Sequence, residues 1–389
     1  MDFRLGAKSD QFRAEVRAFL DEHVTPDVLE RCHDNGVYHD ADFSKAVRER
    51  GYLALGWAVE DGGQGRDPLE VLAYQEEAHR ADAPIYGIST TMMIANVINT
   101  LGTPQQRAAI LPRAFDAEIV IALGFTEPEN GSDAAAAATK AVPDGDGWRI
   151  TGSKMFTTNA HLADYVFLLA RTNVAAPKHA GLTTFLVPLD QPGVEVRAVR
   201  TLSGERTNVT FYNDVYVGDD WRIGEVDHGW QVMNVAFASE HAASFAGEQS
   251  RLLAAFVRWA READDEAGEP IAANPAVTER IGRTRAELEI SRLLLRRATW
   301  YKVTNDPQLH GRGSMSKLFS TERLQRQADE TLQLVGPDGL RAKGDPTAVQ
   351  SGTIEHMVRH AKGTTIYAGT SEIQRNIIAQ HTLGLPRPT

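Results

Sequence analysis

The order of helical and extended segments constrains the fold of this chain more than any other feature. Apolar residues recur at helical spacing through the first 120 residues, as at Phe12, Val16 and Leu20. Five short runs rich in β-branched and aromatic residues then follow one another, at 148–156, 165–171, 183–189, 194–202 and 209–217. Their connections are too short for crossover helices, which predicts an antiparallel sheet or barrel.

Helical periodicity returns near residue 228 and continues toward the end of the chain. Asp67-Pro68 and Thr103-Pro104 carry the cap-then-proline signal of a helix start. Later helices are predicted over 229–262, 275–305, 314–335 and 371–381, and the acidic stretch Ala263–Pro275 is the best candidate for an internal linker. The predicted domains are an N-terminal all-α domain (1–120), a middle β domain (121–228) and a C-terminal helical domain (229–389).

Composition excludes several classes of protein. Lys and Arg number 41 against 52 Asp and Glu, a net charge of −11 that argues against sequence-independent binding of nucleic acid. Cys32 is the single cysteine, so no intrachain disulfide or thiolate metal cluster is expected. Neither an apolar signal core at the N-terminus nor a run of about 18 apolar residues occurs, so a cytoplasmic protein without a membrane span is expected.

The same element order argues against a dinucleotide-binding α/β domain. That fold needs strand–helix alternation and a glycine fingerprint between strand and helix, and the chain has neither. His356 and His360 stand at helical i, i+4 spacing, but no third ligand is apparent. We therefore expect a solvated helix face there and no metal site.

The most informative segment runs from Gly124 to Asp133 and is predicted to be a loop that leaves an apolar strand. Thr126 and Ser132 offer hydroxyl donors, and Gly131 allows backbone N–H groups to approach an anion closely. A capped surface turn is the alternative interpretation.

Two further segments carry candidate binding groups. Phe156 and Thr158 are two residues apart, so on a strand they would share a face and offer a planar heterocycle an aromatic wall and a donor. A core Phe beside a polar Thr is the alternative. Thr370 is a candidate N-cap of the last helix with Glu372 in its first turn, a place where a phosphate-bearing ligand can bind.

These motifs, taken in order, closely resemble those of the acyl-CoA dehydrogenase family. The shared patterns are Thr-Glu-Pro…Gly-Ser-Asp, Lys-Met-aromatic-x-Thr-Asn and Gly-Thr-Ser-Glu-Ile-Gln-Arg, and they span nearly the whole chain together with Asp61–Gly65 and Gln333–Gly336. The resemblance implies an N-terminal helical domain, a middle antiparallel β-barrel or sandwich, a C-terminal four-helix bundle and FAD as cofactor.

The resemblance also implies which residues of the middle domain hold FAD. Thr126 and the backbone around it, including Phe125, would meet the flavin ring. Ser132, after Gly131, would bind the pyrophosphate region. Phe156 would lie against the isoalloxazine, where the family usually has Trp.

Further FAD contacts are implied from the end of that motif and from the C-terminal domain. Thr158 would hydrogen-bond near the flavin N5 edge. Thr370 and Glu372 would contact FAD from the C-terminal domain, and Gln333 and Gly336 would belong to a half-site lent by a neighbouring subunit.

The family reaction needs a base to take the α-proton while the β-hydrogen leaves as hydride. Many members carry this glutamate just before Gly-Thr in the C-terminal motif, but here the position is Ala368. Other members carry it ten residues after the residue that follows a glycine, and counting from Gly229-Trp230 gives Glu240. Glu240 is therefore the candidate base, with an exposed helix glutamate as the alternative. The next residue is His241, where the family usually has Arg; it tunes Glu240 or merely replaces Arg structurally.

The lent half-site departs from the family pattern. Residues 280–283 lack the Phe-Gly of the family motif, and Pro337 replaces the second glycine after Gln333. Two interpretations stay open: a homo-oligomer, dimer or tetramer, that holds FAD differently, or a homologous partner subunit that supplies the missing half.

The function that the resemblance implies is FAD-dependent α,β-dehydrogenation of an acyl-CoA thioester to the 2-enoyl-CoA, in fatty acid or steroid side-chain metabolism. Electron-transfer flavoprotein is the expected electron acceptor. A flavin-dependent oxygenase or oxidase on the same fold and a partner subunit that binds little FAD are the alternatives. Glu240 favours the dehydrogenase, because an oxygenase needs no carboxylate over the α-carbon.

Overall fold

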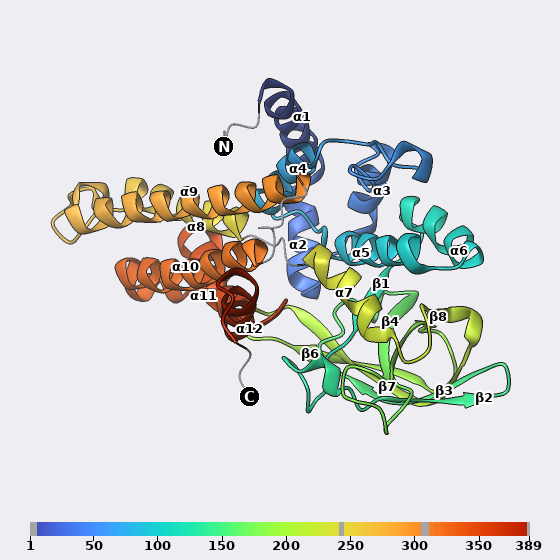
Figure 1. Ribbon diagram of the computed structural model, residues 1–389. Coiled ribbons are helices and arrows are strands. Elements are labelled where there is room, and N and C mark those ends of the chain that lie inside the picture. Colours follow the sequence, from blue (N-terminus) through green and yellow to red (C-terminus); the bar gives the residue numbers. More distant parts are fainter. Residues whose placement is uncertain (1–5, 241–244, 305–310, 387–389) are drawn as a thin grey trace. The chain divides into compact units, whose positions relative to one another are not determined.

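The computed structural model describes residues 6–240, 245–304 and 311–386, except the side chains of 238–240 (Figure 1). The chain divides into two compact units. The helical unit comprises Met1–Val24, Asp67–Ala83 and His241–Thr389, and the sheet unit comprises Thr25–Arg66 and Pro84–Glu240. Because these units interleave along the chain, the expected domain boundaries at 120 and 228 stay a prediction.

The sheet unit contains, in its described part, an eight-stranded sheet in the order β6-β7-β3-β2-β4-β5-β8, with β1 paired to β4. The β1–β4 and β2–β4 pairings are parallel and the others antiparallel. The strands are β1 (Ile121–Gly124), β2 (Lys140–Asp144), β3 (Gly147–Lys154), β4 (Tyr165–Arg171), β5 (Leu182–Pro188), β6 (Val194–Arg200), β7 (Arg206–Gly218) and β8 (Arg222–Ile223).

The five predicted runs are confirmed as β3 to β7. The apolar strand predicted before the loop at Gly124 is confirmed as β1. The sequence missed β2 and β8, which are short and depend on their neighbours in the sheet rather than on a pattern of their own. The middle domain is thus mainly antiparallel, as expected.

Helices cover one face of this sheet (Figure 1). Ile98, Phe167 and Met233 are fully buried in the core between the sheet and these helices. Successive residues of a strand point to opposite faces, so Leu168 packs with Tyr212 in a second core on the other face. The helices of the sheet unit are α2 (Pro26–Asn35), α3 (Ala41–Glu49), α5 (Tyr86–Leu101), α6 (Pro104–Phe115) and α7 (Gly229–Glu240).

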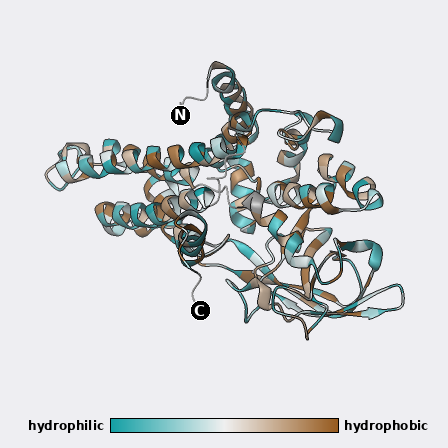
Figure 2. Cartoon of the chain, in the orientation of Figure 1, coloured by the Kyte–Doolittle hydropathy of each residue, from teal (hydrophilic) through white to brown (hydrophobic). Residues whose placement is uncertain are grey.

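The helical unit contains the predicted four-helix bundle, formed by α8, α9, α10 and α11. Polar and apolar residues alternate along its helices in Figure 2, as amphipathic helices require. Its helices are α1 (Ala7–His23), α4 (Pro68–Arg80), α8 (Ala246–Glu262), α9 (Pro275–Val303), α10 (Arg312–Val335), α11 (Thr353–Thr364) and α12 (Ser371–Ile377), followed by a π turn (Ile378–Thr382).

A buried carboxylate fastens α1 to α4. Glu77 accepts hydrogen bonds from Arg13 (3.0 Å), Arg17 (3.0 Å) and Arg80 (2.7 Å). Burial opposes the charge of Glu77, but the three guanidinium groups outweigh it and lower its pKa to about 2.

Several local predictions can be compared directly with the structure. The helix starts at Asp67 and Thr103 are confirmed, each with a capping box. A single helix over 229–262 is wrong, because α7 ends at Glu240 and Phe245 is the non-helical N-cap of α8. The stretch 263–275 joins α8 to α9 inside the helical unit, so it connects two helices rather than two units. The predicted helix ranges did not include α11, although His356 and His360 were recognised at helical spacing.

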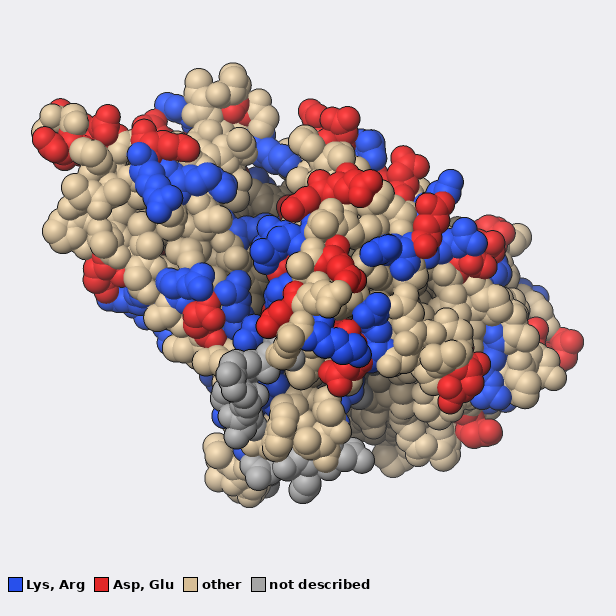
Figure 3. Space-filling view, turned by 90° about the horizontal axis from the view of Figure 1, so that it is seen from above, with Lys and Arg blue, Asp and Glu red and all other residues tan. Residues whose placement is uncertain are grey.

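Charge on the molecular surface is mixed in sign. Acidic and basic side chains are interspersed over the face that Figure 3 shows. No helix in the described residues has the length and apolar character needed to cross a membrane.

Candidate functional site

The loop that follows β1 forms a tight turn with an open tip. Glu127 and Asn130 exchange backbone hydrogen bonds of 3.0 and 3.1 Å, and the Thr126 carbonyl accepts the Met155 N–H at 2.8 Å. Gly131 and Ser132 lie exposed at the tip. Gly131 has no positive φ, and a Cβ there would meet nothing within 4 Å. The protein's own fold therefore does not require this glycine, which leaves space for a bound group.

Phe125, at the start of the same loop, is half-buried. Its ring meets the rings of Phe167 and Phe237 edge-on, at centroid distances of 5.8 and 6.0 Å. Packing against the core thus accounts for this side chain, and only its main chain belongs to the open loop.

The segment after β3 is a turn, so the expectation that Phe156 and Thr158 share one face of a strand is wrong. The strand ends at Lys154 because Phe156 and Asn159 adopt left-handed φ angles of 58° and 63°. A bulky residue is seldom left-handed, and Phe156 remains 56% exposed, so burial does not compensate the strain. Thr158 lies beside Thr207, with a hydroxyl–hydroxyl distance of 3.0 Å. A strained, exposed aromatic beside a hydroxyl is typical of a ligand contact.

The C-terminal motif forms a turn before α12. Thr370 caps this helix as expected, since the Ile373 N–H donates to its hydroxyl at 3.2 Å. Ala368 and Gly369 are left-handed, with φ of 53° and 81°. Thr370 therefore has a structural role as well as the proposed role in binding.

A buried lysine, which the sequence interpretation missed, holds this turn. Lys317 on α10 is 2% exposed and donates to the carbonyls of Tyr367 (2.7 Å) and Gly369 (2.6 Å). Gln374 donates to the carbonyl of Ala368 at 3.0 Å. The only sequence signal was a lysine among small residues of α10, and that pattern does not reveal that its ammonium group is buried.

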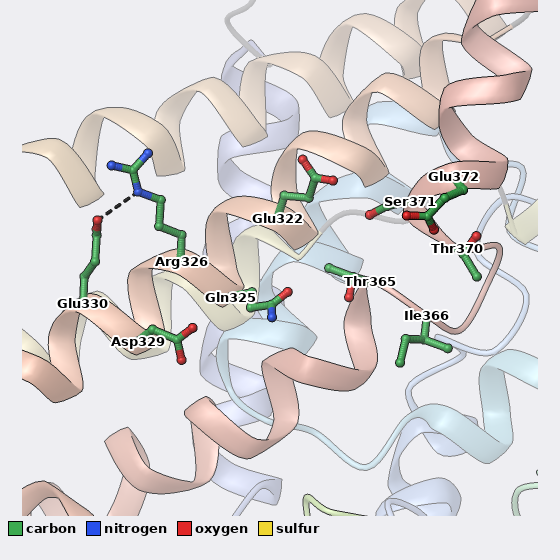
Figure 4. A pocket seen from close by; sticks show the side chains of 10 residues that line it. All are labelled: Glu322, Gln325, Arg326, Asp329, Glu330, Thr365, Ile366, Thr370, Ser371 and Glu372. Carbon is green, nitrogen blue, oxygen red and sulfur yellow. Dashed lines mark hydrogen bonds and ion pairs between the residues drawn. The ribbon is translucent and has the colours of Figure 1, made fainter.

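Thr370, Ser371 and Glu372 line a hollow of about 590 Å³ between α10 and this turn (Figure 4). Its other lining residues are Glu322, Gln325, Arg326, Asp329, Glu330, Thr365 and Ile366. Four of the lining side chains are carboxylates and one is a guanidinium. Like charges repel, so this lining suits hydroxyl and amino groups of a ligand better than a phosphate.

Gln333 and Gly336 lie at the C-terminal end of α10. Gln333 is exposed, and Gly336 ends the helix with φ of 74° and open space where a Cβ would stand. Arg280, in the stretch that departs from the family, pairs with Glu330 of α10. This arginine is thus engaged within its own unit.

The candidate base falls at the edge of the described residues. Glu240 is the last residue of α7, while its side chain and the whole of His241 lie outside the described part. At the start of the same helix, the Trp230 ring meets His179 edge-on at 4.7 Å. The role of Glu240 stays a prediction.

His356 and His360 do not form the solvated face that was expected. Both are half-buried, and their rings stack at 5.9 Å on α11. In the residues that the structure describes, no group of three or more His, Cys, Asp or Glu is arranged to hold a metal ion.

Comparison with known proteins defines the class of protein. Models of the N-terminal, middle and C-terminal domains of acyl-CoA dehydrogenases match residues 7–118, 122–214 and 227–383. The chain belongs to the acyl-CoA dehydrogenase family, and it is accordingly an FAD-dependent oxidoreductase of acyl-CoA thioesters.

Individual relatives match along their whole length. Acyl-CoA dehydrogenase IpdE1 of Mycobacterium tuberculosis is 32% identical over 97% of this chain and 98% of its own, and FadE26 of the same organism is 30% identical over 98% of each. The ChsE4–ChsE5 complex from M. tuberculosis contains a chain with a TM-score of 0.91 and 30% identity, covering 100% of both chains. The Tcur3481–Tcur3483 steroid ACAD contains a chain with a TM-score of 0.91 and 32% identity, also covering 100% of both.

Proposed function

We propose that this chain dehydrogenates the acyl-CoA thioester of a steroid side chain in the cytoplasm, with Glu240 as the base and a homologous subunit as partner. The observation that carries the cofactor site is the exposed, left-handed Phe156 beside Thr158. A fold that holds an aromatic ring strained and exposed favours contact with a bound planar group.

The residues of the sheet unit fit FAD. Phe156 and Thr158 offer a ring and a hydroxyl to the flavin, and the open Gly131–Ser132 tip offers room and a donor to the pyrophosphate. When bound, FAD supplies the acceptor for the hydride that leaves the β-carbon. The acidic hollow beside Thr370 and Glu372 suits uncharged hydroxyl and amino groups of the cofactor and not its phosphates.

The assignment of Glu240 as the base rests on its motif position, ten residues after Trp230. The turn before α12 offers only the methyl group of Ala368 at the position where other family members carry a glutamate. A base at Glu240 takes the α-proton, once hydrogen bonds have polarised the thioester carbonyl.

The partner and substrate follow from two separate observations. Arg280 is engaged by Glu330 within its own unit, and Pro337 alters the half-site motif, which together favour a partner chain that completes the FAD site. Two similar solved structures are complexes of two different chains, and one of them is described as a steroid ACAD. We propose electron-transfer flavoprotein as the acceptor that reoxidises the cofactor.

Replacing Glu240 by Gln tests this function, because the amide keeps the size of the side chain and removes its basicity. We expect anaerobic flavin reduction by a steroid acyl-CoA to slow by about 10²–10⁴-fold while FAD stays bound. Stopped-flow absorbance of the protein, co-purified with its homologous partner where one is needed, measures both quantities.

The matched control is Glu372→Gln, which removes the other candidate carboxylate. We expect this variant to weaken FAD binding more than it slows chemistry. Near-wild-type reduction by Glu240→Gln, together with an FAD-loaded but inactive Glu372→Gln, would show that the base lies before α12.

A further inference from the structure

The two FAD motifs of the sheet unit meet at one buried ion pair. Lys154, the last residue of β3, is 0% exposed, and its ammonium group lies 2.7 Å from the carboxylate of Glu127, itself 6% exposed. The same ammonium group donates to the Phe125 carbonyl at 3.4 Å. One cation thus contacts two residues of the loop that follows β1.

Glu127 also organises the opposite end of that loop. Its two carboxylate oxygens accept the backbone N–H groups of Ala138 at 2.7 Å and Thr139 at 2.9 Å. Burial opposes its charge, but the ion pair with Lys154 and these two amides outweigh burial and lower the pKa of Glu127. The carboxylate therefore closes the loop by joining its first and last turns.

Residues 134–138 of this loop are all alanines, so this run has no polar side chains of its own. Arg171 donates to the carbonyls of Ala135 (2.6 Å) and Ala137 (3.3 Å), and Asn130 donates to Ala136 (2.8 Å). Because alanine makes no side-chain hydrogen bond, the course of this segment is set by polar side chains from outside it. The same contacts therefore also position Gly131 and Ser132, which precede the alanine run.

The Glu127–Lys154 ion pair also adjoins the second FAD motif, the turn with Phe156 and Thr158. The strained turn with Phe156 and Thr158 begins directly after Lys154, and the Met155 N–H is bonded to the Thr126 carbonyl. Moving the Lys154 ammonium group would therefore displace both motifs together.

We infer that Glu127 and Lys154 are positioning residues for the cofactor, which set the FAD affinity by fixing the Gly131–Ser132 tip and the Phe156–Thr158 turn in one geometry. This inference rests on the proposed function. Stability alone is a weak reason for such a pair, because the desolvation of two buried charges largely offsets their attraction. The pair lies instead where two binding segments must be held at fixed spacing.

Glu127→Gln tests the inference, since it removes the charge and keeps the size. We expect the dissociation constant for FAD to rise by about 10–100-fold, the usual cost of losing a residue that orients binding groups. Equilibrium dialysis of the purified full-length protein measures the constant, and calorimetry gives the unfolding temperature of the FAD-free protein.

Asp40→Asn is the matched control in the same unit. Asp40 is a 9% exposed carboxylate that pairs with Arg31 at 2.8 Å and accepts the Phe43 N–H at 2.9 Å at the start of α3. We expect it to lower the unfolding temperature and to change FAD affinity by less than about twofold. Equal loss of affinity in both variants, or wild-type affinity in Glu127→Gln, overturns the inference.

A second measurement does not depend on a variant that folds poorly. Burial lowers the pKa of Lys154 to about 8, against the attraction of Glu127. Above that pH the ammonium group loses its proton and the ion pair, so FAD affinity of the wild type should fall as pH rises from 7 to 9. The neighbouring charges keep their state, because Arg171 stays cationic and burial raises the pKa of Tyr212.

The outcomes separate the two proposals. Lys154→Arg, which retains its charge, should lack this fall in affinity between pH 7 and 9. A pH-independent wild-type affinity contradicts the inference alone. A wild type that binds no FAD at any pH, with or without a homologous partner, overturns the proposed function and the inference with it.

Discussion

Two turns of this molecule are built on a buried lysine, and they use it in different ways. The turn after β3 in the sheet unit has Lys154 at 0% exposure, and the turn before α12 in the helical unit has Lys317 at 2%. Each turn contains a left-handed residue other than glycine, Phe156 or Ala368. Lys154 binds the carboxylate of Glu127, whereas Lys317 donates to the main-chain carbonyls of residues 367 and 369.

The difference reflects which backbone groups each turn has to satisfy. Beside β3, the N–H groups of Ala138 and Thr139 need an acceptor, and a carboxylate that serves them needs a cation to balance its charge. Before α12, the left-handed residues turn carbonyls inward, and an ammonium group can satisfy two of them directly. A buried lysine thus supports either kind of turn. The free energy lost when the lysine is removed depends on its partner, which is a carboxylate beside β3 and a pair of main-chain carbonyls before α12.

The largest expected effect comes from Lys154→Met, which leaves the Glu127 carboxylate buried without its cation. Breaking a buried ion pair from one side costs about 3–5 kcal/mol of the free energy of unfolding. Urea denaturation of the FAD-free protein measures the change. The double variant Lys154→Met with Glu127→Leu should recover much of the loss, and failure to recover it would show that the ion pair is not the source.

A smaller effect is expected for Lys317→Met. It removes the donor that Lys317 offers to the Tyr367 and Gly369 carbonyls, which costs about 1–3 kcal/mol. The same denaturation measurement applies, with Lys362→Met as control, because Lys362 is a half-exposed lysine of the same unit paired with Asp329 at 2.6 Å. If Lys317→Met costs more than Lys154→Met, the contrast drawn between the two turns is wrong.

The smallest effects concern Phe156 and Ala368, one left-handed residue from each turn. Replacing Phe156 or Ala368 by Gly relieves the strain of a positive φ, and after the entropy cost of glycine each variant should gain about 0.5–1 kcal/mol of stability. The two should differ in function, since only Phe156→Gly removes a proposed flavin contact and should weaken FAD binding. Unchanged FAD affinity in Phe156→Gly would contradict the assignment of Phe156 to the flavin.

Much of the fold could be predicted from the sequence. Strands β3 to β7 were recognised because each carries its own run of β-branched and aromatic residues, and the caps at Asp67, Thr103 and Thr370 were recognised because a cap is a local interaction. The connection at 263–275 was recognised as well, because an acidic, glycine- and proline-containing composition is a local signal; it joins α8 to α9.

The residues of the candidate site could be predicted only in part from the sequence. Motif order indicated Thr126, Ser132, Phe156 and Thr158, but the left-handed turn at Phe156 left no mark in the residue pattern. The burial of Lys154 and Lys317 could not be predicted from the sequence, because burial of an ammonium group depends on partners far away in sequence.

The sequence by itself determined the order of helices and strands, the family and the residues that carry its motifs, since periodicity, caps and motif spacing are properties of neighbouring positions. The tertiary structure alone decided which segments share a unit, that the Phe156 turn and the Gly131 loop meet at Glu127 and Lys154, and that carboxylates outnumber cations around the hollow beside Thr370. Those features arise when residues distant along the chain are brought together, so that desolvation and charge pairing between them set the geometry.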